Sequence, residues 1–271
     1  DRPIGWWLLF WPCVFGVWLS GAGWQLGLLL LLLVGAIAMR GAGCVYNDIA
    51  DAQLDRQVAR TATRPIASGR VSRRTAWIWL AALCAVGLIV LLQLPLQAQI
   101  IALVSLLLVA AYPFMKRITW WPQAWLGLTF NWGVLVGWAA LSGENWGVAI
   151  AVYLGCVLWT IGYDTIYALQ DREDDALVGI RSSALRMGGK VKQGVAVCYA
   201  GAVLLWAIGF WLLREDWVAW LTLIPVAWHL AWQVVTLDES DGDNPLARFR
   251  ANRWAGFLLA LACFVVGNAG V

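Results

Sequence analysis

Charged residues are scarce in this sequence: Asp, Glu, Lys and Arg make up 13% of the 271 residues, whereas hydrophobic residues make up 62%. A soluble domain would carry about a quarter charged residues. Histidine occurs once, at His229, where we expect a polar contact between packed helices. The six cysteines lie singly and form no CxxC pair, so the pattern indicates neither a metal centre nor a disulfide framework. These shortages favour an integral membrane protein without a nucleic-acid-binding module.

Long apolar runs are abundant, and a helix that crosses a bilayer needs roughly 20 predominantly apolar residues. Gly and Pro interrupt several runs, which membrane helices tolerate. The sequence predicts an all-α membrane protein with nine transmembrane helices, over residues 4–20, 24–43, 75–93, 96–113, 120–141, 146–168, 193–213, 217–237 and 252–271.

The 19 Lys and Arg residues are unevenly placed along these runs. With nine spans, all of them except Arg214 fall on the side of the N-terminus. Because Lys and Arg collect in cytoplasmic loops, this side is predicted to be cytoplasmic, or the matrix side in a mitochondrion. We therefore expect a bacterial inner-membrane protein or, as the alternative, a mitochondrial inner-membrane protein.

The loops on this basic side are long and polar, and those on the other side are short. One follows the second run, another follows the sixth, and YPFMKR, residues 112–117, follows the fourth. The active site is therefore expected at the basic end of the bundle. The acidic clusters recur four spans apart, which suggests one domain, 1–271, built from two similar four-helix units, 4–113 and 120–237, plus a ninth helix, 252–271.

Two acidic clusters carry the chemistry. Each helical residue advances about 100°, so Asp48, Asp51 and Asp55 fall within about 60° of one another, and Asn47, Asp51 and Asp55 within about 80°. A second set falls within about 40° on the same assumption, namely Asp164, Asp171 and Asp175. Each cluster thus makes one carboxylate face. A solvated loop with ordinary salt bridges would explain either cluster alone, but it explains two matched clusters poorly.

Grouped carboxylates near a membrane repel one another, and a divalent cation relieves that repulsion. Oxygen ligands without nearby His or Cys select a hard ion. Mg²⁺ is usually held by one or two carboxylates together with phosphate oxygens and waters. The clusters therefore predict a site for a metal-bridged diphosphate, whose remaining charge would be met by basic residues of the same loops: Arg60, Arg64, Lys116, Arg117, Arg181 and Lys190.

At these motifs the chain resembles the UbiA-type membrane prenyltransferases, and the resemblance covers essentially its whole length. The family's NDxxDxxxD motif stands at Asn47, Asp48, Asp51 and Asp55, its RTxxRPxxSG continuation at residues 60–69, and its DxxxD motif at Asp171 and Asp175. One departure is Ala52, where many bacterial members have Arg, so any role of a basic group there would pass to Arg56.

The resemblance implies a helical bundle around a central cavity with a lateral opening for the lipid tail. It also implies two Mg²⁺ ions. Their ligands would be Asn47, Asp51 and Asp55 on one side and Asp171 and Asp175 on the other, with Asp48 and Asp164 supporting or replacing a ligand.

Within that family the chain is most similar to members that prenylate 4-hydroxybenzoate in ubiquinone synthesis, as judged from RPIG, MRGAGCVYND, LGLTFNWG and YDTIYALQDREDD with its continuation GIRSSALR. The substrates implied are polyprenyl diphosphate and 4-hydroxybenzoate, and the ring would attack from the position ortho to its hydroxyl. Asp164 would accept the ring proton, and Arg117 and Arg2 would hold the acceptor carboxylate. The allylic cation would be stabilised by the aromatic faces of Trp132, Tyr163 or Tyr167, and the substrates would be contacted by Tyr112, Tyr163 and Tyr167.

Three other functions fit parts of the sequence. The same chemistry could act on dihydroxynaphthoate, homogentisate or haem. A transporter of Mg²⁺ or an organic anion could use the acidic clusters, although the uncharged side offers few polar groups. A phosphatidyltransferase could use paired DxxxD ligands, but the DGxxAR lead-in of that class is missing from the sequence.

Overall fold

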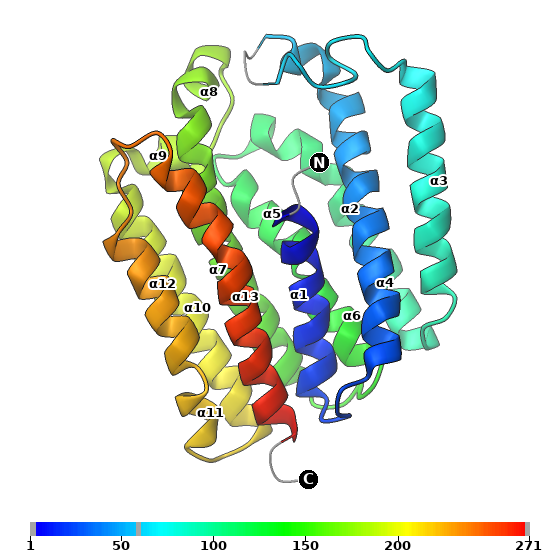
Figure 1. The fold of residues 1–271 in the computed structure, drawn as a ribbon, viewed down its shortest axis with the longest axis vertical. Coiled ribbons are helices and arrows are strands. Elements are labelled where there is room, and N and C mark those ends of the chain that lie inside the picture. The colour runs from blue at the N-terminus through cyan, green and yellow to red at the C-terminus, as the bar shows by residue number, and fades with distance from the viewer. Residues whose placement is uncertain (1–3, 58–60, 269–271) are drawn as a thin grey trace.

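The computed structural model describes residues 4–57 and 61–268, and all regular structure in that part of the chain is helical. Figure 1 shows long helices running roughly side by side, with the short helices α8 and α11 at opposite ends. The helices are α1 (Ile4–Leu19), α2 (Leu26–Asp55), α3 (Arg73–Leu91), α4 (Leu96–Ile118), α5 (Pro122–Phe130), α6 (Gly133–Ala139), α7 (Trp146–Ala168), η1 (Leu169–Asp171), α8 (Arg172–Val178), α9 (Ser183–Met187), η2 (Gly188–Lys190), α10 (Val191–Leu213), α11 (Val218–Leu221), α12 (Ile224–Val235) and α13 (Asn244–Asn268).

Seven helical segments are long and apolar enough to cross a membrane, and α1 is a shorter apolar helix. The chain is therefore an integral membrane protein with an all-helical fold. Each predicted span coincides with one helix or with a pair of helices, but the number of nine crossings stays a prediction.

Residues 120–141, predicted as one span, form the two short helices α5 and α6. The break falls at Asn131, whose buried carboxamide donates hydrogen bonds to Gly127 O at 2.8 Å and to Cys156 O at 3.0 Å. After the break, α6 lies so close to α1 that a Cβ on Gly133 would be 2.6 Å from Cys13 Sγ. The predicted span is thus two helices because a side chain competes for the helix carbonyls and the second helix packs tightly.

Two helices extend past their predicted spans. Helix α2 continues twelve residues beyond position 43, to Asp55, and α4 continues through Pro113 to Ile118. Hydropathy marks where the apolar environment ends, and helical hydrogen bonding can continue into the polar layer. YPFMKR, which we expected in a loop, is therefore helical, and NDxxDxxxD lies on a helix, as the angular spacing of its residues assumed.

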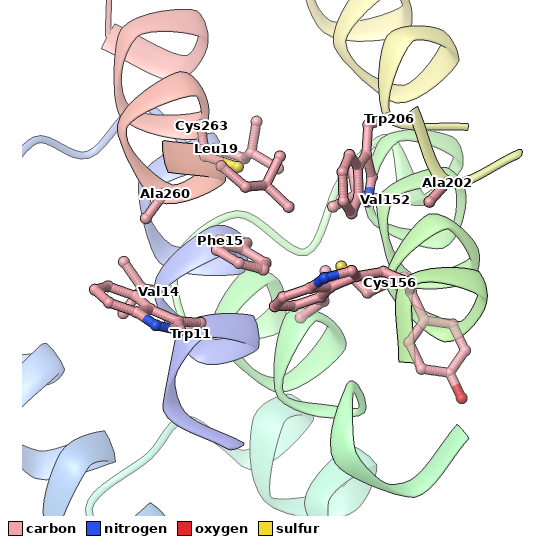
Figure 2. Packing of buried hydrophobic residues seen from close by; sticks show 14 of the residues in the cluster. Trp11, Val14, Phe15, Leu19, Val152, Cys156, Ala202, Trp206, Ala260 and Cys263 are labelled. Carbon is pink, nitrogen blue, oxygen red and sulfur yellow. The ribbon is translucent and has the colours of Figure 1, made fainter. Parts of the chain in front are cut away.

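Helix α7 forms the centre of the bundle, whereas α3 and α4 leave most of their surface exposed. In Figure 2, Phe15 of α1, Cys156 of α7, Trp206 of α10 and Cys263 of α13 lie in one packed region. A buried polar network adds to it: Trp159 Nε1 donates to Asn252 Oδ1 at 2.8 Å, and the Asn252 amide donates to Gln233 at 2.9 Å. These contacts fix α7, α12 and α13 to one another.

His229 of α12 makes the polar contact between packed helices that the sequence suggested. Its Nε2 lies 3.1 Å from the Ala251 carbonyl of α13. The division of the chain into two four-helix units stays a prediction.

The α1–α6 contact yields a prediction about stability. A Cβ on Gly16 would lie 2.2 Å from Val134 O and 2.6 Å from Trp138 N, both backbone atoms, so neither can move aside cheaply. We expect Gly16→Ala to destabilise the protein by about 1–3 kcal/mol, as overpacking does. The measurement is the loss of helical circular dichroism on heating in detergent.

Gly27 of α2 provides the matched control for Gly16, because a Cβ on Gly27 would have no described atom within 4 Å beyond the helix itself. Gly27→Ala is expected to leave the melting temperature unchanged or to raise it, since Ala favours a helix over Gly by up to about 1 kcal/mol. Equal destabilisation by both substitutions would contradict the close-packing account.

Candidate active site

One cavity of about 210 Å³ receives side chains from both acidic motifs. It lies where the chain after α2 and the chain after α7 reach the same end of the bundle, the upper end in Figure 1. Asn47 and Asp55 come from the first motif, and Asp171 and Asp175 from the second. The remaining lining residues are Leu54, Thr61, Arg64, Tyr112, Pro113, Lys116, Pro122, Gln123, Asp164, Tyr167, Ala168, Ile180, Arg181 and Ser182.

The first acidic motif occupies the last turns of α2. The buried carboxylate of Asp55 receives a hydrogen bond from Arg64 Nη1 at 3.0 Å, and the same nitrogen lies 3.1 Å from Asp48 Oδ1. Arg64, from the segment after α2, therefore shares its single positive charge between two acids of this motif. Asp48 contacts Arg64 but does not itself line the cavity among the described residues.

Asp51 has cation partners different from those of Asp48 and Asp55, and it has no exposed surface. Lys116 Nζ donates to its Oδ2 at 2.5 Å, and Arg117 Nη2 donates to its Oδ1 at 3.1 Å. Two cations at the end of α4 thus compensate one fully buried carboxylate of α2. In the described part of the chain Lys116 lines the cavity and Asp51 does not, so a role for Asp51 as a metal ligand stays a prediction.

The second acidic motif is not one regular helix. Helix α7 ends at Ala168, a 3-10 turn covers Leu169–Asp171, and α8 begins at Arg172. The angular spacing predicted for Asp164, Asp171 and Asp175 assumed a continuous α-helix, and this assumption was wrong, whereas the spacing itself stays a prediction. Asp164, Asp171 and Asp175 nevertheless all line the cavity.

The predicted aromatic residues separate into two groups. Tyr112 and Tyr167 line the cavity. Tyr163 is buried, accepts a hydrogen bond from Thr160 at 3.2 Å and packs against Trp159. Trp132 donates to Ile101 O at 2.8 Å. Among the described residues, neither Tyr163 nor Trp132 lines the cavity.

The predicted cations are placed as follows. The cavity is lined by three of them, Arg64, Lys116 and Arg181. Two others, Arg117 and Lys190, are exposed and are not among the described residues that line it. The predicted roles of Arg2 and Arg60 lie outside the described residues.

Three hydrogen bonds join the segment that carries Arg181 to the end of α4 and the start of α5. Arg181 N donates to Lys116 O at 3.1 Å, and Arg181 Nη1 donates to Ile118 O at 2.6 Å. Ser183 N donates to Gln123 Oε1 at 3.1 Å. These bonds bring the second acidic motif against the end of α4.

Sequence reasoning missed several polar residues near the site. Thr61, Gln123 and Ser182 line the cavity, but isolated polar residues in such segments carry no periodic signal. The prediction from sequence used Arg40 of α2 only as one of the basic residues that indicate how the chain is oriented in the membrane. Its Nε is buried without a hydrogen-bond partner among the described residues, and its guanidinium lies 5.5 Å from the Phe130 ring centre. Arg40 stands seven residues before Asn47, which places both on the same face of a helix, and this spacing could have identified Arg40 as a residue near the site.

The walls of the cavity offer oxygen ligands, which suit a hard cation. In the described part of the chain, no three acidic, His or Cys side chains lie close enough to hold a metal ion by themselves. The donor set therefore fits an ion that takes part of its coordination from a phosphate ligand, as Mg²⁺ commonly does.

A helical membrane protein that gathers acids and cations around one cavity at its end has the construction of a membrane enzyme for an anionic substrate. The chain belongs to the UbiA prenyltransferase family, which matches residues 9–266.

One relative is the "4-hydroxybenzoate polyprenyltransferase, mitochondrial" of Aedes aegypti, which is 42% identical over 268 residues, 96% of this chain. This chain spans 60% of the length of that relative.

Solved structures share the fold. The apo structure of a UbiA homologue from Aeropyrum pernix K1 superposes with a TM-score of 0.81 at 26% identity, covering 98% of this chain and 99% of that one. A UbiA homologue from Archaeoglobus fulgidus, bound to DMAPP and Mg²⁺, gives a TM-score of 0.70 at 19% identity, covering 98% and 96%. The second likeness concerns the fold alone.

Proposed function

We propose that this chain transfers a polyprenyl group from polyprenyl diphosphate to the ring of 4-hydroxybenzoate, ortho to the hydroxyl, in ubiquinone biosynthesis. The observation that carries the proposal is the shared cavity, in which Asn47 and Asp55 of one motif meet Asp171 and Asp175 of the other. The printed name of the Aedes aegypti relative supports the same reaction.

The donor headgroup would lie between the two acidic walls. Two Mg²⁺ ions, when bound there, would act as Lewis acids on the leaving diphosphate. The proposed ligands are those of the two motifs, Asn47, Asp51, Asp55, Asp171 and Asp175, with Asp48 in support. Arg64, Lys116 and Arg181 would neutralise the phosphate oxygens that remain, because each contributes a cation to the cavity.

The allylic carbon would lose its diphosphate beside aromatic faces. Tyr112 and Tyr167 line the cavity and can stabilise the developing cation. The acceptor ring would then attack, and Asp164, which also lines the cavity, would take the ring proton. Enclosure of the site by α4, α5 and α7 would limit the access of water to the cation.

For the acceptor carboxylate, Arg40 joins the sequence-derived candidates Arg117 and Arg2. Arg40 is a cation inside a membrane helix, and its charge interacts with that of Asp164. An ionisable residue at that depth needs a functional or pairing explanation. Arg117 is less suited, since it pairs with Asp51 and its side chain is 48% exposed.

We further propose nine crossings, a lateral opening for the polyprenyl tail, and an N-terminus on the basic side. The compartment would be the bacterial inner membrane or, as the name of the Aedes aegypti relative favours, the mitochondrial inner membrane.

A transfer assay tests the reaction. The purified full chain in detergent is incubated with a polyprenyl diphosphate and radiolabelled 4-hydroxybenzoate, with Mg²⁺ or with EDTA. We expect a prenylated product that forms with Mg²⁺, disappears in EDTA and returns when excess Mg²⁺ is added.

Parallel reactions with dihydroxynaphthoate and homogentisate test the choice of acceptor. Product from one of these with none from 4-hydroxybenzoate would replace the proposed acceptor and keep the prenyl transfer. Undiminished turnover in EDTA would refute the role of the metal.

A further inference from the structure

The carboxamide of Gln123 is a candidate ligand group that none of the acidic or basic motifs includes. Gln123 is the second residue of α5, lines the cavity, and is only 5% exposed. Its Oε1 accepts a hydrogen bond from the backbone N–H of Ser183 at 3.1 Å. Because a backbone N–H can only donate, the oxygen must face Ser183, which settles the orientation of the amide.

The amide nitrogen of Gln123 is therefore on the opposite side of the carboxamide. In the described part of the chain, the side chain of Gln123 makes no hydrogen bond other than the one that its Oε1 accepts. This nitrogen is not among the fully buried atoms that lack a partner in the described part of the chain, so it keeps some accessible surface on the cavity that Gln123 lines, where it is free to donate. The position of Gln123 on the cavity wall means that a bound ligand can supply the acceptor.

Ser183 holds this arrangement firmly. Ser183 is fully buried, and its Oγ lies 2.6 Å from Thr165 Oγ1 of α7. The preceding residue, Ser182, caps α9 by accepting from Leu185 N at 3.3 Å. Helices α5, α7 and α9 thus fix the direction of the Gln123 amide, which reduces the entropy lost when it binds a ligand.

The neighbouring residues indicate the ligand. Lys116 and Arg181 supply positive charge to the same cavity, and Asp171 and Asp175 supply acidic groups suited to a metal. A ligand oxygen received among such groups is anionic. We propose that the Gln123 amide donates a hydrogen bond to an oxygen of the donor's diphosphate, and so helps to select a diphosphate headgroup. This inference rests on the proposed prenyl transfer.

The test compares Gln123→Glu with the wild type. Glu can still accept from Ser183 N–H, but it presents a negative oxygen where the amide donated. We expect the dissociation constant for inorganic pyrophosphate with Mg²⁺, measured by calorimetry on the full chain in detergent, to rise about tenfold or more. The KM for the polyprenyl diphosphate should rise in parallel, and the KM for 4-hydroxybenzoate should stay within about twofold.

Two further variants make the result decisive. Gln193→Glu introduces the same charge at an exposed position on α10, outside the described cavity lining, and should leave pyrophosphate binding unchanged. Gln123→Met removes the amide donor without adding charge, together with the acceptor of Ser183 N–H, and should weaken pyrophosphate binding in the same direction. Melting curves identify any variant that fails to fold, in which case the other Gln123 variant decides.

Three outcomes would overturn the inference: unchanged pyrophosphate affinity in the folded Gln123 variants, equal weakening by Gln193→Glu, or a rise confined to the KM for 4-hydroxybenzoate. Failure of the proposed function looks different. A wild-type protein that forms no prenylated product refutes the transfer reaction, whereas pyrophosphate binding still reports on Gln123.

Discussion

Replacing Asp171 by asparagine is expected to slow prenyl transfer roughly a thousandfold, because a Lewis-acid contribution of about 4 kcal/mol corresponds to three factors of ten. Asp171 lies at the end of the 3-10 turn and lines the same cavity as Asn47 and Asp55. Asparagine keeps the size of the side chain and removes its charge. We expect kcat to fall and the Mg²⁺ concentration needed for half-maximal activity to rise, as measured by titrating Mg²⁺ in the transfer assay.

Asp55→Asn makes the same test for the first acidic motif. It should also raise the Mg²⁺ concentration needed for half-maximal activity. Asp241→Asn is the matched control, since Asp241 is exposed in the loop before α13 and only accepts from Asp243 N at 3.0 Å, which asparagine can also do. Its activity should stay within about twofold of wild type. A loss of activity in Asp171→Asn without any change in Mg²⁺ requirement would argue against metal binding by this residue.

Removing both cations around Asp51 is expected to destabilise the fold by about 3–5 kcal/mol, because it leaves a buried carboxylate without compensation. The substitutions are Lys116→Met and Arg117→Met together. Asp51 has no exposed surface, so water cannot replace the lost partners without opening the α2–α4 contact. Chemical denaturation in mixed detergent micelles, followed by circular dichroism, measures the loss.

The charge of Asp51 can then be removed as well. Adding Asp51→Asn to the double variant should restore most of the lost stability, since replacing a whole buried ion pair is often close to neutral. Arg74→Met serves as control for loss of an exposed cation and should change stability by less than about 0.5 kcal/mol. If the double variant were as stable as wild type, or the triple variant no better than the double, the ion-pair account would be wrong.

The apolar runs located the helices well, because exclusion of charge over a bilayer's thickness leaves a strong signal. They placed helix ends poorly. Helix α2 continues through Asp55 for reasons of backbone hydrogen bonding, which hydropathy does not report. The break at Asn131 depends on acceptors of α5 and α7 that come together only in the folded bundle. The 3-10 turn before Arg172 likewise has no counterpart in residue spacing.

The acidic and basic side chains of the candidate site could be selected from sequence, but their partners could not. Spacing on a helix predicted that Asp48, Asp51 and Asp55 share one face. In the structure, Asp51 forms an ion pair with Lys116, whereas Asp55 forms one with Arg64. Such pairings depend on which segments meet at the end of the bundle. Gln123 escaped notice for the same reason, because its direction is set by Ser183, sixty residues further along the chain.

The hydrogen bonds of Arg181 and Ser183 have a consequence for how substrates enter. Parting the chain after α8 from the α4–α5 connection would break three bonds. At about 1 kcal/mol each, the separated arrangement would make up under about 1% of the molecules at any moment. The part of the cavity wall held by these three bonds is therefore fixed. We therefore expect a charged headgroup to enter on the side of α2, where, in the described part of the chain, Arg64 joins the chain after α2 to the carboxylates of Asp48 and Asp55 and Thr61 Oγ1 donates to Asp55 O.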